Sequence, residues 1–395
     1  MRETVLKKMD KCSGCGLCEI VCPVHAVKMR YDKKGFLYPI IQKEKCINCG
    51  LCEKRCPVEN ISVAYPMTCY AGINLNSKTK EKSSSGGMFA ALAECILEHG
   101  GVVFGAAILP KENIVTVKHI MIKDKAELRM LQGSKYVQSD ARECYPLVKQ
   151  QLLDGKKVLF SGTPCQISAI KSYLENEYEN LLLVDLICHG TPSTLHWEES
   201  LQEKIIPGER ISEVLFRGLD GYMQGEIAIE TNEHQIRKEK YNFVNDHYCA
   251  MFLAGDSYRE SCYQCQYARL ERSGDITIGD FWGFEKIYNQ DQLEKISGIS
   301  LKNGISLISV NTEKGRLICD AIDKERMWFY KADYKKAAQY NPQLSHPSKK
   351  GKNRFIFLIL YQIGGWKLIS SYRNIKTKIK NTIVRSEKKN FKNEG

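Results

Sequence analysis

The sequence reads Cys12-Ser-Gly-Cys15-Gly-Leu-Cys18-Glu-Ile-Val-Cys22-Pro23 and then Cys46-Ile-Asn-Cys49-Gly-Leu-Cys52-Glu-Lys-Arg-Cys56-Pro57. Both stretches follow the pattern C-x2-C-x2-C-x3-C-P. Three closely spaced thiolates of this pattern hold one [4Fe–4S] cluster, and the fourth, which precedes proline, reaches the other cluster. We therefore predict two [4Fe–4S] clusters with crossed ligand sets. The first set is Cys12, Cys15, Cys18 and Cys56, and the second is Cys22, Cys46, Cys49 and Cys52.

Zinc binding and disulfide bonding are the alternative explanations of these cysteines. Zinc sites favour separate C-x2-C pairs over a triple run with a trailing Cys-Pro. Disulfides need an oxidising compartment, and residues 1–10 lack the apolar stretch of a secretory signal. No run approaches 18 apolar residues, so no transmembrane helix is expected. The 17 cysteines therefore indicate thiolate ligands in a reducing cytoplasm.

The chain of 395 residues is too long for a ferredoxin alone and predicts two or three domains. Its 43 % hydrophobic and 26 % charged residues are ordinary for a globular protein. The net charge of +12 is concentrated at the C-terminal end, where residues 345–395 hold 13 Lys and Arg and 2 Asp and Glu. The rest of the chain is close to neutral, which argues against a nucleic-acid-binding body.

The fold class expected is α+β: a ferredoxin-like two-cluster N-terminal domain, a mixed-sheet α/β body and a basic helical tail. Residues 24–45 alternate apolar and polar side chains around Asp32–Gly35, which predicts a hairpin between the two cysteine motifs. Strands and helices alternate through the body, with strands expected at 102–109, at 114–122 and from Val158, and buried strands expected at 181–187 and 305–310. The predicted domains are residues 1–66, 67–154, 155–344 and 345–395.

A serine- and glycine-rich loop, Ser83-Ser-Ser-Gly-Gly87, precedes a helix expected over residues 88–99 and ended by Gly100. The serines are candidate N-caps, and Gly100 suits the position after the last helical residue. Free backbone N–H groups at such a helix start suit a phosphate or pyrophosphate. A capped helix without any ligand is the simpler alternative.

Four further cysteines could form another site. Cys165 and Cys188 each follow a predicted strand, where α/β folds place functional loops. Cys262 and Cys265 form a C-x2-C pair. From spacing alone, a zinc site, an iron–sulfur site and a set of buried free cysteines all remain open. The remaining cysteines are not part of any such group, and those at 95 and 319 are expected in the core.

Six short stretches of the body stand in a fixed order: Ser84-Ser-Gly-Gly87, Gly133-Ser-Lys-Tyr136, Gly162-Thr-Pro-Cys165-Gln, Cys188, Cys262-x-x-Cys265 and Asp275-Ile-x-x-Gly279-Asp280-x-Trp282-Gly283. As a set, they resemble the coenzyme F420 hydrogenase/dehydrogenase beta-subunit family, in the form that carries an N-terminal two-cluster ferredoxin. The resemblance covers about residues 1–300. It implies an FAD and a third [4Fe–4S] cluster held by Cys165, Cys188, Cys262 and Cys265.

The same resemblance implies residues close to the flavin. Lys135 would be a catalytic cation that stabilises the reduced flavin, and Asp280 would be a second catalytic residue. A solvated surface lysine and a loop aspartate are the respective alternatives. His189 could tune a cluster or donate a proton, but simple packing is preferred. The implied cofactor-binding residues are Ser84, Ser85, Gly86, Gly87, Ser134 and Lys135.

The function expected is an oxidoreductase that passes single electrons through [4Fe–4S] clusters to FAD for hydride reduction of an organic substrate. A redox partner protein such as a ferredoxin would donate the electrons, and a homo-oligomer stays open. Relatives use the deazaflavin coenzyme F420, reduce chlorophyll-type pigments or occur in bacterial gene sets for surface polysaccharides. The composition favours a bacterium without F420, and hence a glycan precursor or another unsaturated metabolite. The alternatives are a deazaflavin oxidoreductase, an electron-transfer subunit without its own substrate, and a scaffold or redox sensor without flavin.

The tail combines an apolar stretch, residues 355–366, with a basic helix in which Ile375, Ile379 and Ile383 share one face. Such a helix could lie on the anionic inner surface of the membrane. A helix docked on the body with a solvated basic end is the alternative.

Overall fold

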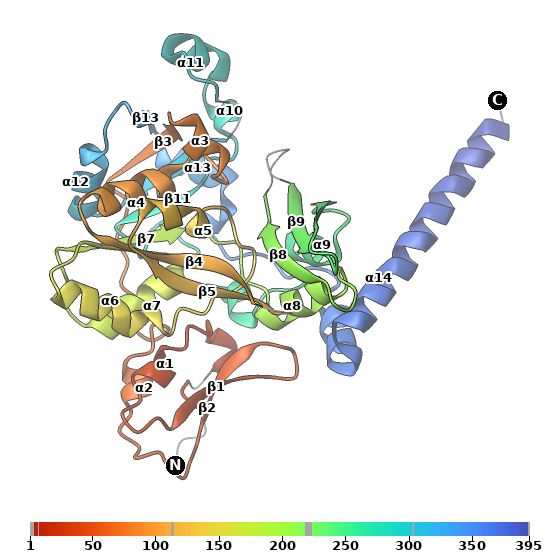
Figure 1. Cartoon of the computed structure of the whole chain (residues 1–395), viewed down its shortest axis with the longest axis horizontal. Coiled ribbons are helices and arrows are strands. Elements are labelled where there is room, and N and C mark those ends of the chain that lie inside the picture. Colours follow the sequence, from red (N-terminus) through yellow and green to blue (C-terminus); the bar gives the residue numbers. More distant parts are fainter. Residues whose placement is uncertain (1–3, 7, 112–113, 218–222, 302–303, 394–395) are drawn as a thin grey trace.

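An eight-stranded mixed sheet forms the centre of the body in the computed structural model (Figure 1). The structure describes residues 4–6, 8–111, 114–217, 223–301 and 304–393, with side chains described as far as residue 379. The strand order is β13-β3-β12-β11-β7-β6-β4-β5. The middle strands β11, β7, β6 and β4 are parallel, and the outer pairings are antiparallel. The strands are β3 (Thr68–Asn74), β4 (Val102–Lys111), β5 (Ile114–Ile122), β6 (Val158–Gly162), β7 (Leu181–Leu186), β11 (Ile276–Asp280), β12 (Ser306–Val310) and β13 (Met327–Ala332).

Helices cover both faces of this sheet, because side chains alternate along each buried strand. Val103 and Leu159 face α4 (Met88–Glu98) and α12 (Glu313–Ala321). Phe104 and Phe160 face α6 (Cys144–Leu153) and α7 (Pro164–Leu174). Every residue of β6 is buried, as a central strand between two helical layers requires.

The predicted start of α4 is wrong in one detail. Gly87, and not a serine, is the N-cap, and its φ of 87° lies in the left-handed region. No side chain caps the helix, so the first N–H groups of α4 are left without a side-chain partner. Gly100, with φ of 70°, ends the helix as predicted.

A smaller antiparallel sheet of β8 (Arg210–Leu215), β9 (Gln224–Glu230) and β10 (Ile236–Asn242) packs beside the large one. Its apolar face joins α8 (Thr194–Gln202), α9 (His247–Leu253) and the start of the tail in one core. The remaining body elements are α3 (Ser77–Glu81), η2 (Lys125–Glu127), α5 (Leu128–Leu131), η3 (Glu260–Gln264), α10 (Phe284–Ile287), α11 (Gln290–Ser297), α13 (Tyr334–Tyr340) and η4 (Pro342–Leu344).

The ferredoxin domain lies against the α6–α7 side of the body (Figure 1). The predicted hairpin is confirmed: β1 (Val27–Tyr31) and β2 (Leu37–Ile41) are antiparallel, and the Asp32 carboxylate accepts from two N–H groups of the turn. The other elements are η1 (Met9–Lys11), α1 (Leu17–Ile20) and α2 (Leu51–Lys54). Leu17 of α1 is buried in the core formed with α6 and α7, so the two domains share packed side chains.

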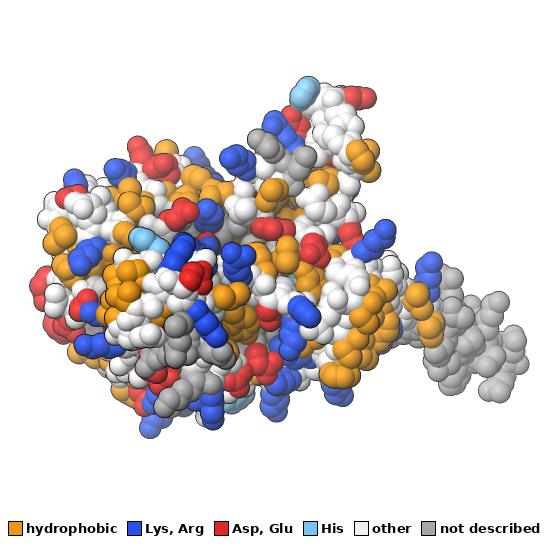
Figure 2. All heavy atoms as spheres, turned by 90° about the horizontal axis from the view of Figure 1, so that it is seen from below, with side chains coloured by type: hydrophobic (Ala, Val, Ile, Leu, Met, Phe, Trp, Pro, Cys, Tyr) orange, Lys and Arg blue, Asp and Glu red, His pale blue; other side chains and the backbone are white. Residues whose placement is uncertain are grey.

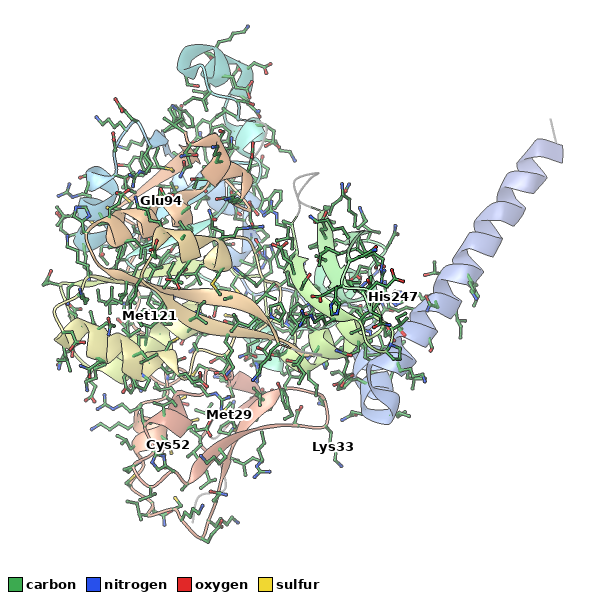
Figure 3. The ribbon with its side chains drawn as sticks, in the orientation of Figure 1. Met29, Lys33, Cys52, Glu94, Met121 and His247 are labelled. Carbon is green, nitrogen blue, oxygen red and sulfur yellow. The ribbon has the colours of Figure 1, made fainter. Side chains whose placement is uncertain are left out.

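The tail is one long helical segment, α14 (Arg354–Asn393), broken by non-helical backbone at Gly364 and Gly365. The helix is docked on both sides of this break, because Glu199 of α8 accepts from Tyr361 Oη at 2.8 Å and from Trp366 N at 3.0 Å. Trp366 and Ile369 are buried, and the helix projects from the body only beyond them, with His247 of α9 near the point of departure (Figures 1 and 3).

By length and composition alone, the helix over residues 354–379 is long and apolar enough to cross a membrane. The break at Gly364–Gly365 interrupts this segment, and residues on both sides of the break are docked on the body. The side chain of Ile383, predicted on the apolar face, lies outside the described residues.

Candidate redox-cofactor site

The structure brings cysteines of the two ferredoxin motifs close together, and the division into crossed sets stays a prediction. Cys12 and Cys56 pack side by side, although 44 residues separate them in the chain. Burial raises the pKa of Cys18 well above its usual value, and the thiols of Cys15, Cys12 and Cys56 raise it further. Cys52 likewise faces Cys22 and Cys49.

These thiols fit iron. Burial raises the pKa of Cys15 and Cys56 to about 12, so both thiols are protonated at neutral pH when no metal is bound. Only the thiolate binds metal, and a bound cation displaces the proton. In the second set Cys49 is exposed, whereas Cys12 and Cys56 of the first are buried.

Each cysteine motif turns through glycines, and those of the first motif also meet the body. Gly14 has φ of 70° and Gly16 has φ of 74°, values that favour glycine. A Cβ on Gly14 would lie 2.5 Å from Nη2 of Arg259, and a Cβ on Gly16 would overlap the Arg142 side chain. The body thus presses two arginines against the backbone of the first motif.

Hydrogen bonds fix the ferredoxin loops on the body. Gln138 Nε2 donates to the carbonyl oxygens of Ser13 at 3.1 Å and Gly14 at 3.2 Å. Tyr145 Oη donates to Cys15 O at 3.0 Å, and Tyr267 Oη donates to Pro57 O at 2.9 Å. Both cysteine motifs are therefore held by side chains of the body.

The four body cysteines surround a second location, a cavity of about 110 Å³. Cys165 lies in the first turn of α7, Cys188 follows β7, and Cys262 and Cys265 lie at η3. Burial raises the pKa of Cys188 well above its usual value, and Cys262, Cys165 and Cys265 add to this effect. Among the described residues, no three potential ligands are close enough to hold a single metal ion. The four thiols instead line one hollow.

A larger cavity of about 280 Å³ adjoins the first. Cys165 and Cys188 line both cavities, and Cys15 of the ferredoxin domain reaches the larger one. The residues predicted near a flavin converge there from separate elements. Those lining the cavity are Ser84, Ser85, Gly87, Ser134, Lys135 and Asp280.

Gly86, also predicted at the flavin, lies behind this lining. Asn74 N donates to Gly86 O at 2.6 Å. A Cβ on Gly86 would lie 2.5 Å from the backbone N of Ser306 and would overlap Gly72 O. Gly72 and Ser306 are paired neighbours in β3 and β12, so the loop rests directly on the sheet.

The two predicted flavin loops touch each other. Ser134 N donates to Ser84 Oγ at 2.6 Å, and Ser85 Oγ donates to Ile305 O at 2.9 Å. The uncapped start of α4 borders the same cavity, since Gly87 and Met88 are among its lining residues.

Lys135 is half-buried, and its ammonium group is hydrogen-bonded to the chain. Its Nζ donates to Leu131 O and Gln132 O, both at 2.8 Å, at the end of α5. Burial, and to a smaller extent the charge of Arg129, lower the pKa of Lys135 to about 7. The side chain can therefore gain or lose a proton near neutral pH inside the cavity.

Asp280 is paired, since Arg217 Nη1 donates to its Oδ2 at 2.7 Å. The two side chains are only 21 % and 10 % exposed, and both line the larger cavity. His189 lines both cavities, and burial lowers its pKa while Asp280 opposes that effect.

Sequence reasoning missed several residues of this site, among them His119, Gln138, Arg217 and Arg259. His119 Nε2 lies 2.9 Å from Ser161 O and its Nδ1 lies 2.9 Å from Ser139 Oγ. Burial lowers the pKa of His119 to about 4, so the ring is neutral. A histidine at an inward position of an alternating strand was the available signal.

Comparisons with known proteins identify the family of each part of the chain. Residues 155–335 match the profile for the C terminus of the coenzyme F420 hydrogenase/dehydrogenase beta subunit, and residues 69–143 match the profile for its N terminus. Residues 11–60 match a 4Fe-4S dicluster domain. A solved chain of the F420-reducing [NiFe] hydrogenase complex from Methanosarcina barkeri is 15 % identical, with a TM-score of 0.42, covering 71 % of this chain and 91 % of that one. A search of curated proteins finds no match.

Proposed function

Because the chain belongs to the coenzyme F420 hydrogenase/dehydrogenase beta-subunit family, we propose that it is a flavin-dependent reductase fed by a protein electron donor. Its membership and its 4Fe–4S dicluster domain make it an iron–sulfur oxidoreductase. The proposal adds FAD, a third cluster and an organic substrate.

The adjoining cavities are the observation that supports this proposal most directly. Cys165, Cys188 and His189 line both the hollow among the four body cysteines and the larger cavity. Cys15, from the first ferredoxin set, also reaches the larger cavity. Three redox groups bound at these places would be neighbours.

The residues that would hold FAD are the loop at 84–87, Ser134 and Lys135. The free N–H groups at the start of α4 suit its pyrophosphate. Protonated Lys135 would place a cation where the reduced flavin carries negative charge. When bound, the clusters would carry single electrons, and the flavin would store two for exchange as hydride.

The surface around the second ferredoxin set suits an external donor. Cys49 is exposed, and Ile47 beside it is 61 % exposed. A donor that docks there would reach the outermost cluster first. The same surface also favours the second candidate function, an electron-transfer subunit that serves a partner enzyme.

The substrate we propose is an unsaturated organic metabolite, such as a precursor of a surface glycan, with deazaflavin F420 as the alternative. The ion pair of Arg217 and Asp280 at the cavity offers both a cation and a carboxylate to such a molecule. A screen of hydride acceptors with the reduced protein separates these classes.

Iron and flavin content after anaerobic purification is the first test. About 12 iron atoms and one FAD per chain would support three clusters with flavin. About 8 iron atoms without flavin would refute both additions. A stable co-purifying enzyme, with no acceptor reduced by the isolated chain, would favour the electron-transfer subunit.

We also propose that the tail places the protein at the inner membrane surface. Phe355 and Ile363 of α14 are 75 % and 73 % exposed, whereas Tyr361 of the same helix is docked on the body. Figure 2 shows hydrophobic side chains gathered where the tail leaves the body. Lys349, Lys350, Lys352 and Lys367 flank this surface, which suits anionic lipid.

A further inference from the structure

Arg259 is a buried cation at the junction of the ferredoxin domain and the body. The residue is 1 % exposed. Its Nε and Nη2 donate to Gln138 Oε1 at 3.2 and 3.0 Å. Its guanidinium lies over the rings of Phe36 and Tyr38, with centroids 5.3 and 4.8 Å away.

This cation lacks a carboxylate partner among the residues that the structure describes, and its Nη1 is buried without a hydrogen bond. The other deeply buried arginine, Arg272, is by contrast paired with Asp185 at 2.6 Å. Burying an uncompensated charge is strongly unfavourable. A negative group must therefore balance Arg259 in the working protein.

Cysteines of two predicted clusters lie close to Arg259, and Cys262 N donates to Arg259 O at 3.0 Å. Burial raises the pKa of Cys12, Cys165 and Cys262, and the charge of Arg259 opposes that rise at all three. Gly14, in the loop between Cys12 and Cys15, rests on the guanidinium so closely that a Cβ there would lie 2.6 Å from Cζ. Cys12 belongs to the first ferredoxin set, and the other two belong to the body set.

We propose that Arg259 is the shared counter-charge of the first ferredoxin cluster and the body cluster, and that it raises the reduction potential of both. Each reduction adds one electron and no other charge to a cluster, and a fixed nearby cation favours the more negative state. This inference rests on the proposed third cluster for its second half only.

The test is a redox titration of the full-length chain, purified anaerobically and followed by the EPR signals of the reduced clusters. Arg259→Met removes the charge, and Arg259→Lys keeps it. Arg210→Met is the matched control, because it makes the same change at an exposed arginine of β8, away from the predicted clusters. We expect Arg259→Met to weaken reduction of both clusters at least tenfold, which is about 59 mV for one electron. The other two variants should stay close to wild type.

Unchanged potentials in Arg259→Met would overturn the proposal, as would equal shifts in Arg259→Met and Arg259→Lys. Loss of iron from both variants would also overturn it, since lysine keeps the charge and packing would then be the cause. Iron loss confined to Arg259→Met supports it. If wild type holds only about 8 iron atoms per chain, the proposed third cluster is absent. The reduction potential of the first ferredoxin cluster in Arg259→Met then still tests the role of Arg259.

Discussion

Replacing Gly86 by alanine tests whether the loop at 84–87 keeps its position because its backbone packs directly on the sheet. The backbone N of Ser306 and the carbonyl oxygen of Gly72 occupy the space that a Cβ would need. Both atoms belong to paired strands, so neither can move as the end of a flexible side chain could. The loop must therefore lift, which also strains the 2.6 Å hydrogen bond from Asn74 N to Gly86 O.

The expected cost has two parts. Overpacking a well-packed site costs about 1–3 kcal/mol, and the strained hydrogen bond adds roughly 0.5–1.5 kcal/mol. We expect Gly86→Ala to lower the free energy of unfolding by about 3 kcal/mol. Gly100→Ala is the control: its φ of 70° is strained for alanine, but nothing lies within 4 Å of its Cβ. That variant should lose only about 1–2 kcal/mol.

Urea denaturation followed by circular dichroism measures both values, and flavin absorbance after gel filtration reports the cofactor. Gly86→Ala should lose flavin and Gly100→Ala should not. The reasoning is refuted if Gly86→Ala is as stable as wild type. If its stability falls but its flavin stays, the packing argument holds and the flavin site lies elsewhere.

Lys135, Cys165 and the tail each give a further test. Burial lowers the pKa of Lys135 to about 7, so above about pH 7 the folded chain loses a proton that the unfolded chain still holds. The flavin-free protein should therefore become more stable between about pH 7 and 9. Urea denaturation should show this gain in wild type and not in Lys135→Met. Cys165→Ser should reduce the iron content from about 12 to about 8 atoms per chain, whereas Cys69→Ser, in the core, should leave it unchanged; equal iron in both would contradict the third cluster. Phe355→Glu should weaken co-sedimentation with anionic phosphatidylglycerol vesicles. Gln362→Glu, at an exposed polar position of the same helix, should weaken it much less. Equal binding of wild type and both variants would exclude this surface as the membrane contact.

Local signals predicted much of the fold. The cysteine spacing of the ferredoxin domain and the turn at Asp32–Gly35 depend on residues close in sequence, and the structure confirms the hairpin. The strand at 114–122 is observed at the predicted residues. The predicted N-cap of α4 was wrong because the serines have better capping propensity than Gly87, yet the sheet beneath the loop demands a glycine conformation there.

The site residues that the sequence did not predict are brought together by contacts between distant segments. Arg217 meets Asp280 across 63 residues, and Gln138 meets Ser13 across 125. The role proposed for Arg259 depends on the ferredoxin loop at Gly14, which lies against its guanidinium. None of these pairs leaves a periodic or motif signal in the sequence, because the topology of the sheet decides which ends meet.

The close fit of Gly14 and Gly16 against two arginines of the body has a consequence for protein engineering. A free ferredoxin needs a glycine at such a turn only for its backbone angles, and its outer surface can vary. Here the same backbone also packs closely against the side chains of Arg142 and Arg259. Exchange of this domain for another ferredoxin should fail unless Arg142 and Arg259 are redesigned with it, so the two-cluster domain is a fitted part of this chain and not an interchangeable module.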